Sequence, residues 1–255
     1  MPRGFTRRFV QFDAAILAAI LAASAYAQGG PPFVTDDPGT PGNGTWEVNA
    51  AVIGAQSHRH WDLAAPDLDI NYGLGEQVEL NVDLNWASAE AAGGRRMSGL
   101  GAADVGVKWR FVEQDKSGFA LSVYPQMLMN LASSSAARGL TTEGREFLLP
   151  AQISTVYGAF EFDAEAGRNL VQGGSDAWVA GVIVAHACGP NLECGLELHG
   201  ELIEHQLDPL VNLGVHWGMT EHVVLLASFG RDLGSGGVDG QSFLFYFGIQ
   251  YLRKP

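Results

Sequence analysis

An uninterrupted alternation of apolar and polar side chains runs through Val78-Glu79-Leu80-Asn81-Val82-Asp83-Leu84-Asn85-Trp86. Successive side chains of a β-strand point to opposite faces, so this stretch predicts a strand with an apolar medium on one side and water on the other. A similar alternation, with apolar residues on one face and mostly polar residues on the other, recurs in segments 67–72, 104–111, 160–165, 196–199, 211–217 and 242–251. The chain is therefore predicted to be all-β.

The alternating segments and the turns between them predict about twelve antiparallel strands. We expect these strands at residues 45–55, 66–74, 77–87, 100–113, 117–131, 145–158, 159–169, 176–188, 192–204, 209–220, 222–232 and 241–252. The alternation is least regular in 176–188 and 222–232. An even number of strands is typical of single-chain bacterial outer-membrane barrels.

The connections fall into two classes when the first strand is started on the periplasmic side. Those on the inside are short: 73–77, 113–117, 157–159, 188–193 and 218–222. Several on the outside are longer and more polar, notably 87–98 and 132–146. Short periplasmic turns and longer external loops are typical of outer-membrane barrels.

Aromatic residues gather near both ends of the predicted strands, as in the two aromatic belts of membrane barrels. The periplasmic set is Trp46, Tyr72, Trp109, Phe111, Phe119, Tyr157, Phe160, Trp217 and Tyr251, and the external set is Trp86, Trp178, Phe229 and Phe243. We therefore expect a transmembrane antiparallel β-barrel in the cell outer membrane. The alternative is an exported soluble β-sandwich or lipocalin-like barrel.

The N-terminus has the features of a cleaved signal peptide. Arg3, Arg7 and Arg8 precede an apolar run at 14–23, and Ala25-Tyr26-Ala27 supplies small residues for cleavage after Ala27. The apolar run is shorter than the roughly 20 residues that a membrane-spanning helix needs. We predict a signal peptide at 1–27, an irregular periplasmic or plug segment at 28–44, rich in Gly and Pro, and the barrel at 45–255.

The charge of the chain argues against nucleic acid as a partner. Cleavage takes three of the 15 Lys and Arg and one of the 28 Asp and Glu, which leaves 12 basic and 27 acidic residues. Binding to phosphate backbones needs clustered Lys and Arg. The partners that we expect are outer-membrane lipid, a small solute and the barrel assembly machinery.

Most of the charges on the predicted inner face are acidic. The predicted lumen-lining residues are Glu47, Asp67, Asp69, Glu79, Asp83, Asp104, Lys108, Arg110, Glu161, Asp163, Glu165, Glu197 and Glu201. Acidic linings favour cations, so one interpretation is a narrow, partly plugged channel for a small solute. The alternative is a structural barrel with a sealed lumen, since any membrane barrel turns polar residues inward.

Several short stretches resemble the outer-membrane family named for the "MetA-pathway of phenol degradation". They are Pro31-Pro32-Phe33-Val34-Thr35-Asp36-Asp37-Pro38, Gly44-Thr45-Trp46-Glu47, Tyr124-Pro125-Gln126, Leu213-Gly214-Val215, the Leu225-Leu226 to Gly230-Arg231 stretch and Gly248-Ile249-Gln250-Tyr251. The resemblance covers most of the mature chain and implies a transporter-like barrel for an aromatic or hydrophobic solute. It supplies no catalytic residues. The chain departs from such barrels by ending on Leu252-Arg253-Lys254-Pro255 rather than on an aromatic residue.

Cys188 and Cys194 bracket a predicted periplasmic turn, and two nearby cysteines in an oxidising compartment favour a disulfide over free thiols. We expect no metal site and no cofactor. Two cysteines do not complete a zinc site, and Asp36-Asp37 supplies too few oxygens for Ca²⁺, so we expect this pair to cap a turn. His58 and His60, in the first external loop, could bind a metal ion only with further ligands, which this loop does not supply. No Gly-x-Ser-x-Gly motif is present, so we expect no enzyme.

Overall fold

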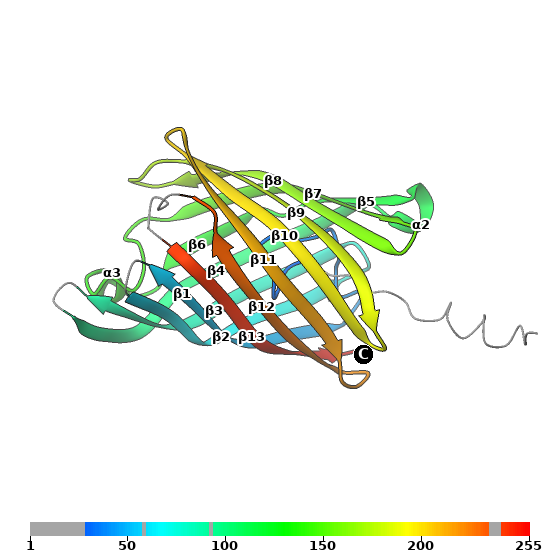
Figure 1. The fold of residues 1–255 in the computed structure, drawn as a ribbon, viewed down its shortest axis with the longest axis horizontal. Coiled ribbons are helices and arrows are strands. Elements are labelled where there is room, and N and C mark those ends of the chain that lie inside the picture. The colour runs from blue at the N-terminus through cyan, green and yellow to red at the C-terminus, as the bar shows by residue number, and fades with distance from the viewer. Residues whose placement is uncertain (1–28, 58–59, 92–93, 235–240) are drawn as a thin grey trace, which may run out of the picture.

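The computed structural model describes residues 29–57, 60–91, 94–234 and 241–255. The predicted signal peptide (1–27), the first residue of the predicted 28–44 segment and His58 lie outside the described residues. From Trp46 onward the strands form one antiparallel sheet that closes on itself (Figure 1).

The strands are β1 (Trp46–Ser57), β2 (His60–Leu74), β3 (Val78–Ala91), β4 (Arg95–Val112), β5 (Phe119–Val123), β6 (Gln126–Asn130), β7 (Glu146–Tyr157), β8 (Phe160–Val171), β9 (Ala177–Gly189), β10 (Leu192–Ile203), β11 (Gln206–Gly218), β12 (Val223–Asp232) and β13 (Gln241–Arg253). Two short helices, α2 (Gln114–Ser117) and α3 (Ser133–Ala136), lie in connections. None of the helices in the described part of the chain is long and apolar enough to span a membrane. The pairing of β1 with β13, from Trp46 opposite Arg253 to Ser57 opposite Gln241, closes the barrel.

β5 and β6 occupy one position in the ring, because both pair with β4 on one side and with β7 on the other. The barrel therefore has twelve strand positions, and the predicted closed twelve-stranded fold is confirmed. The prediction of one continuous strand over 117–131 was wrong, because the strand breaks at Tyr124-Pro125, where proline has no N–H to donate. Two backbone hydrogen bonds of 3.1 Å still cross the break, from Tyr124 to the Pro150 carbonyl and from Val107 to the Pro125 carbonyl.

Burial in this molecule is the reverse of that in a soluble protein. Polar side chains such as Asn49, Glu197 and Asn212 are at most 1% exposed, whereas apolar ones such as Leu198 and Leu213 are more than half exposed. The apolar side chains point outward along the strands and the polar ones fill the lumen, as a membrane barrel requires. This arrangement excludes the soluble β-sandwich, which would bury its apolar face between two sheets.

Aromatic rings form contacts at both ends of the barrel. Trp46 lies 4.7 Å from Tyr72 between ring centroids, at the end where the first strand begins and the last strand ends. Trp61 and Phe229 contact Phe243 at the opposite end. Amphipathic rings at two levels mark the two membrane interfaces. We call the end that holds Trp46 the periplasmic end, because its connections are short.

Candidate functional site: the lumen and its N-terminal segment

The N-terminal segment of residues 29–44, called the lumenal segment below, starts inside the barrel. Thr35 is fully buried and Phe33 and Asp37 are nearly so, although this stretch has no regular secondary structure. The segment leaves along the periplasmic turn between β2 and β3, where the Thr40 hydroxyl donates to the Glu76 carbonyl (2.9 Å). An irregular backbone must find its hydrogen-bond partners in the barrel wall or in water.

Glu197 of β10 binds the backbone of the lumenal segment. Its carboxylate accepts hydrogen bonds from the N–H groups of Val34 (3.0 Å) and Thr35 (2.5 Å). The Asn212 amide, on β11, donates to the second carboxylate oxygen (2.9 Å). These hydrogen bonds satisfy two backbone N–H groups of the irregular segment, so Glu197 anchors the segment to β10.

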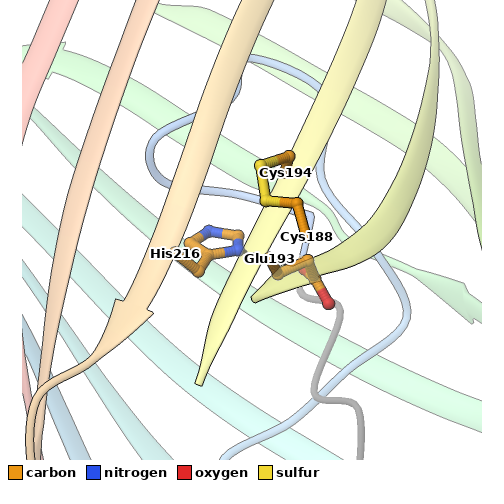
Figure 2. The surroundings of a disulfide bond; sticks show 4 residues. All are labelled: Cys188, Glu193, Cys194 and His216. Carbon is orange, nitrogen blue, oxygen red and sulfur yellow. Dashed lines mark hydrogen bonds and ion pairs between the residues drawn. A yellow bond between two sulfur atoms is a disulfide. The ribbon is translucent and has the colours of Figure 1, made fainter. Parts of the chain in front are cut away.

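Neighbouring strands bind the carbonyl groups of the segment. The Ser228 hydroxyl of β12 donates to the Pro32 carbonyl (2.7 Å), and His216 Nε2 of β11 donates to the Pro31 carbonyl (3.1 Å). The other ring nitrogen of His216 lies 3.3 Å from the Glu193 carboxylate, and Figure 2 shows the two residues on adjacent strands. The wall formed by β10, β11 and β12 thus supplies acceptors for the N–H groups of the segment and donors for its carbonyls.

Phe33 occupies a pocket floored by glycine. A Cβ atom placed on Gly195 or Gly214 would lie 2.5 or 2.6 Å from the Phe33 ring, which is too close for any side chain. The edge of the ring packs against His216, with ring centroids 5.8 Å apart. The absence of side chains at these two glycines therefore creates the space for the ring.

The opposite wall binds the segment through Lys108 of β4. Its ammonium lies 2.9 Å from the Asp36 carboxylate, 3.9 Å from the Glu79 carboxylate and 4.8 Å from the centroid of the Tyr124 ring. A Cβ at Gly106 would lie 2.6 Å from the Tyr124 ring, so this glycine leaves the space that the ring occupies. The segment thus bridges two walls of the lumen, from β10 to β4.

Amide side chains surround the carboxylate of Asp69 on β2. Asn49 (2.9 Å), Asn71 (3.2 Å) and Asn81 (2.5 Å) each donate a hydrogen bond to it. These amides come from β1, β2 and β3. A buried carboxyl group needs such partners, and these three donors replace part of the water that Asp69 has lost.

Three carboxylates stand in one row across the sheet. Asp69 lies opposite Asp83 of β3, and Asp83 lies opposite Asp104 of β4. Directly opposed residues have Cβ atoms about 5 Å apart, and like charges at such positions repel. The row therefore concentrates negative charge on one wall of the lumen.

A cavity of about 400 Å³ lies between the lumenal segment and this wall. Its lining within the described part of the chain includes one cationic side chain, Lys108, and eight acids: Asp36, Asp37, Glu47, Asp69, Glu79, Asp83, Asp104 and Glu165. The remaining lining is largely amide, glycine and proline, with the Tyr124 ring and a few apolar side chains. The cavity is polar and strongly acidic.

The predicted lumen-lining residues divide into three groups. Those that line the cavity are Glu47, Asp69, Glu79, Asp83, Asp104, Lys108 and Glu165. Asp67, Asp163 and Glu197 are buried elsewhere in the barrel, and Arg110, Glu161 and Glu201 are half-buried. Arg110 donates to the Glu76 carbonyl at the periplasmic turn (2.6 Å). The prediction omitted the amides of Asn49, Asn71, Asn81 and Asn212, although the same alternation places them on the inner face.

Cys188 and Cys194 form a disulfide across the β9–β10 hairpin, with Cα atoms 5.9 Å apart (Figure 2). Cys194 lies two residues before Leu196, which is on the outer face, so the bond is on the outside of the barrel at its periplasmic end. The disulfide therefore joins strand ends and takes no part in the cavity.

No family model and no curated protein matches the chain. Among solved structures it is similar to the COG4313 outer-membrane channel from Pseudomonas putida F1, with a TM-score of 0.61 and 13% identity over 85% of this chain and 98% of that chain. It is also similar to the KdgM porin (TM-score 0.56, 12% identity, 80% and 98% covered) and to the NanC porin (TM-score 0.58, 6% identity, 80% and 98% covered). The chain thus has the fold of outer-membrane channels, and the apolar outer face of its closed barrel belongs in the outer membrane.

Proposed function

We propose that the protein is an outer-membrane channel that passes small solutes and prefers cations. The observation that carries this proposal is the cavity between the lumenal segment and the β1–β4 wall, where eight acids surround one ammonium. A confined lining of one charge sign raises the local concentration of ions of the opposite sign. The fold shared with the KdgM, NanC and COG4313 barrels supports a channel.

The lumenal segment sets the width of the pathway. The lumen of a twelve-stranded barrel is intermediate in width. Eight-stranded barrels have an interior that side chains fill, whereas porins with 16 to 18 strands have an open channel. The segment is held by Glu197 on one side and by Lys108 on the other, so it narrows this lumen further. We expect a small conductance that grows when the segment is released.

A second candidate is a structural barrel with a sealed lumen. The observation that favours it is the number of anchors on the segment, which include Glu197, Ser228, His216 and Lys108. A plug held this firmly would block every solute. The two candidates differ in whether folded protein conducts.

We infer that the barrel is not an enzyme. A nucleophilic serine needs a base to take its proton. Two of the buried serines have other partners: Ser122 donates to the Gln152 side chain (2.6 Å), and Ser228 donates to the Pro32 carbonyl (2.7 Å).

The resemblance to the phenol-degradation family adds a proposal on the solute. It implies an aromatic or hydrophobic compound, which could pass in neutral form through a cation-preferring lumen. The test is phenol flux into liposomes that contain the refolded barrel. Flux no faster than into empty liposomes would contradict this proposal.

The charge-neutralised variant Asp69→Asn, Glu79→Gln, Asp83→Asn tests the role of the acids. Reversal potentials in planar bilayers under a KCl gradient should move toward zero in this variant, because three cavity carboxylates are lost. The matched control is Asp115→Asn, which removes an exposed charge on α2. Equal selectivity in the triple variant and the unmodified protein would refute the assignment of selectivity to these acids.

A further inference from the structure

Asp163 of β8 is a fully buried acid without a partner. Its side chain is on the inner face of the barrel and is 1% exposed, and neither carboxylate oxygen has a hydrogen-bond partner among the described residues. A buried carboxyl group has lost its water and almost always has a hydrogen-bond donor or a countercharge in its place. The two unpaired oxygens therefore indicate that a donor belongs at this position.

The lumenal segment begins beside Asp163. The Phe33 ring packs with Ile183 of β9, which lies directly opposite Asp163 in the sheet. Of the charged groups that act on Asp163, Asp37 has the largest effect. Gly29, the first described residue of the segment, contacts Asp37: a Cβ atom on Gly29 would lie 2.7 Å from the Asp37 backbone nitrogen, and the Gly29 N–H donates to the Asp37 carboxylate. The chain therefore enters the described part of the structure at the acids around Asp163.

Two further acids act on Asp163 from the same part of the lumen, namely Glu161 of β8 and Glu193 of β10. The Glu193 carboxylate lies 3.3 Å from the imidazole that binds the Pro31 carbonyl, two residues after Gly29. Lys108, which acts on the neighbouring Asp37, already pairs with two other carboxylates. The start of the segment is thus surrounded by negative charge that Lys108 does not balance.

Removal of the predicted signal peptide supplies a positive group next to Gly29. Hydrolysis of the Ala27–Gln28 peptide bond by the signal peptidase of the host adds one water and leaves a carboxylate on Ala27 and an α-ammonium on Gln28. Consecutive Cα atoms are about 3.8 Å apart, so this ammonium is within reach of the acids that surround Gly29. An ammonium has three N–H donors. A metal ion fits less well, because no three His, Cys, Asp or Glu of the described residues are arranged to hold one.

We infer that Asp163 is the binding site for the α-ammonium of the mature N-terminus at Gln28, and that this ion pair holds the start of the lumenal segment in the barrel. The uncleaved precursor has an uncharged peptide N–H at residue 28, so cleavage after Ala27 would complete the anchoring of the segment. One ammonium offsets the charge of one carboxylate, so Asp37 still titrates beside the remaining acids. The inference includes the predicted cleavage site and goes beyond the proposed channel, because it does not depend on whether the barrel conducts.

The test is the pH dependence of N-terminal labelling in protein that a Gram-negative host has exported and processed. The label is 2-pyridinecarboxaldehyde, which reacts with neutral α-amines, and intact mass reports both the first residue and the extent of labelling. An ordinary terminal amine loses its proton at about pH 8. An ion pair moves this midpoint upward, whereas burial without a partner moves it downward. We expect Gln28 as the first residue and a midpoint about one pH unit higher in the folded protein than in the unfolded chain.

Asp163→Asn removes the proposed partner without changing the size of the side chain. It should abolish the upward shift and speed labelling of the folded protein about tenfold at pH 7, because one pH unit in the midpoint is tenfold in neutral amine. The matched control is Asp67→Asn, which removes a nearly buried lumenal acid on β2 and should keep the shift.

Insertion of one serine between Ala27 and Gln28 is a second variant, which displaces the ammonium and leaves every acid of the barrel in place. It should also lose the upward shift, and it serves as the test if Asp163→Asn does not fold, as judged by heat-shifted gel mobility. A first residue other than Gln28, a blocked N-terminus, or a midpoint no higher in the folded protein than in the unfolded chain would overturn the inference. An equal upward shift in the folded variants would overturn it as well. Conductance tests the channel separately, so failure of one proposal is distinguishable from failure of the other.

Discussion

The Asp36 carboxylate and the Lys108 ammonium form an ion pair, with 2.9 Å between Oδ2 and Nζ, that joins the lumenal segment to β4. Lys108 is nearly buried. Removing one partner of a buried pair leaves an uncompensated charge, at a cost of about 3 kcal/mol or more. Lys108→Met should therefore release this side of the segment and increase single-channel conductance or open time. The control is Lys116→Met, which breaks an exposed ion pair on α2. Unchanged conductance in Lys108→Met would show that the pair does not hold the segment.

A side chain at Gly214 should displace the segment from the other wall. In Gly214→Val the new Cβ would meet the Phe33 ring at about 2.6 Å, so the ring cannot stay in its pocket. We expect a conductance increase with little change in thermal stability of the barrel. Gly189→Ala is the matched control, because its Cβ would make ordinary contact with Leu192 at 3.5 Å. A variant with the ring expelled but the current unaltered would contradict a constricting role for the segment.

Docking of the segment should depend on pH through Asp37. Burial raises the pKa of this carboxyl from 3.8 to about 6, with Lys108 opposing the shift and Asp36 adding to it. The docked state binds the proton more tightly, so docking is firmest below about pH 4 and weakens as pH rises through about 6. Conductance should increase over this window. In Asp37→Asn the increase should be clearly smaller than in the unmodified chain.

The measurement for Asp37 is single-channel recording between about pH 4 and pH 7.5 at constant KCl. The charges of Asp163 on β8, Glu47 on β1 and Lys108 also act on Asp37, and all three groups remain in the Asp37→Asn variant. Asp115→Asn controls for a general loss of charge and should keep the full increase. Conductance that falls over the same range would contradict the sign of this prediction.

The disulfide should stabilise the barrel modestly and have no effect on ion conduction. Cys188 and Cys194 close a short loop, six residues apart, for which chain entropy predicts about 2 kcal/mol. Cys188→Ser, Cys194→Ser should lower the temperature of the heat-induced gel shift by a few degrees, with selectivity unchanged. An altered reversal potential would place the hairpin in the conduction path, against its position on the outer face.

Alternation along the sequence predicted most of the barrel because lipid and lumen impose it directly on each strand. Residues 78–86 lie in β3 as expected, and even the less regular segments 176–188 and 222–232 are strands β9 and β12. The break at Pro125 was not predicted, although a proline inside a central strand is a sequence signal for such a break.

The contacts of the lumen were less predictable than the strands. Alternation shows which side chains face inward, but register decides which of them meet, as with Asp69, Asp83 and Asp104. The segment at 29–44 carries no periodic pattern, so neither the glycine-floored pocket of Phe33 nor the pairing of Asp36 with Lys108 could be read from spacing.

The most direct test of the proposed channel is the reversal potential of the refolded mature chain in a planar bilayer under a KCl gradient. It should be recorded with and without residues 28–39. We predict discrete current steps that reverse near the potassium equilibrium potential, with larger steps in the shortened chain. Reversal near the chloride potential would contradict the acidic selectivity element. The absence of current from both folded proteins would contradict a channel and support the sealed structural barrel.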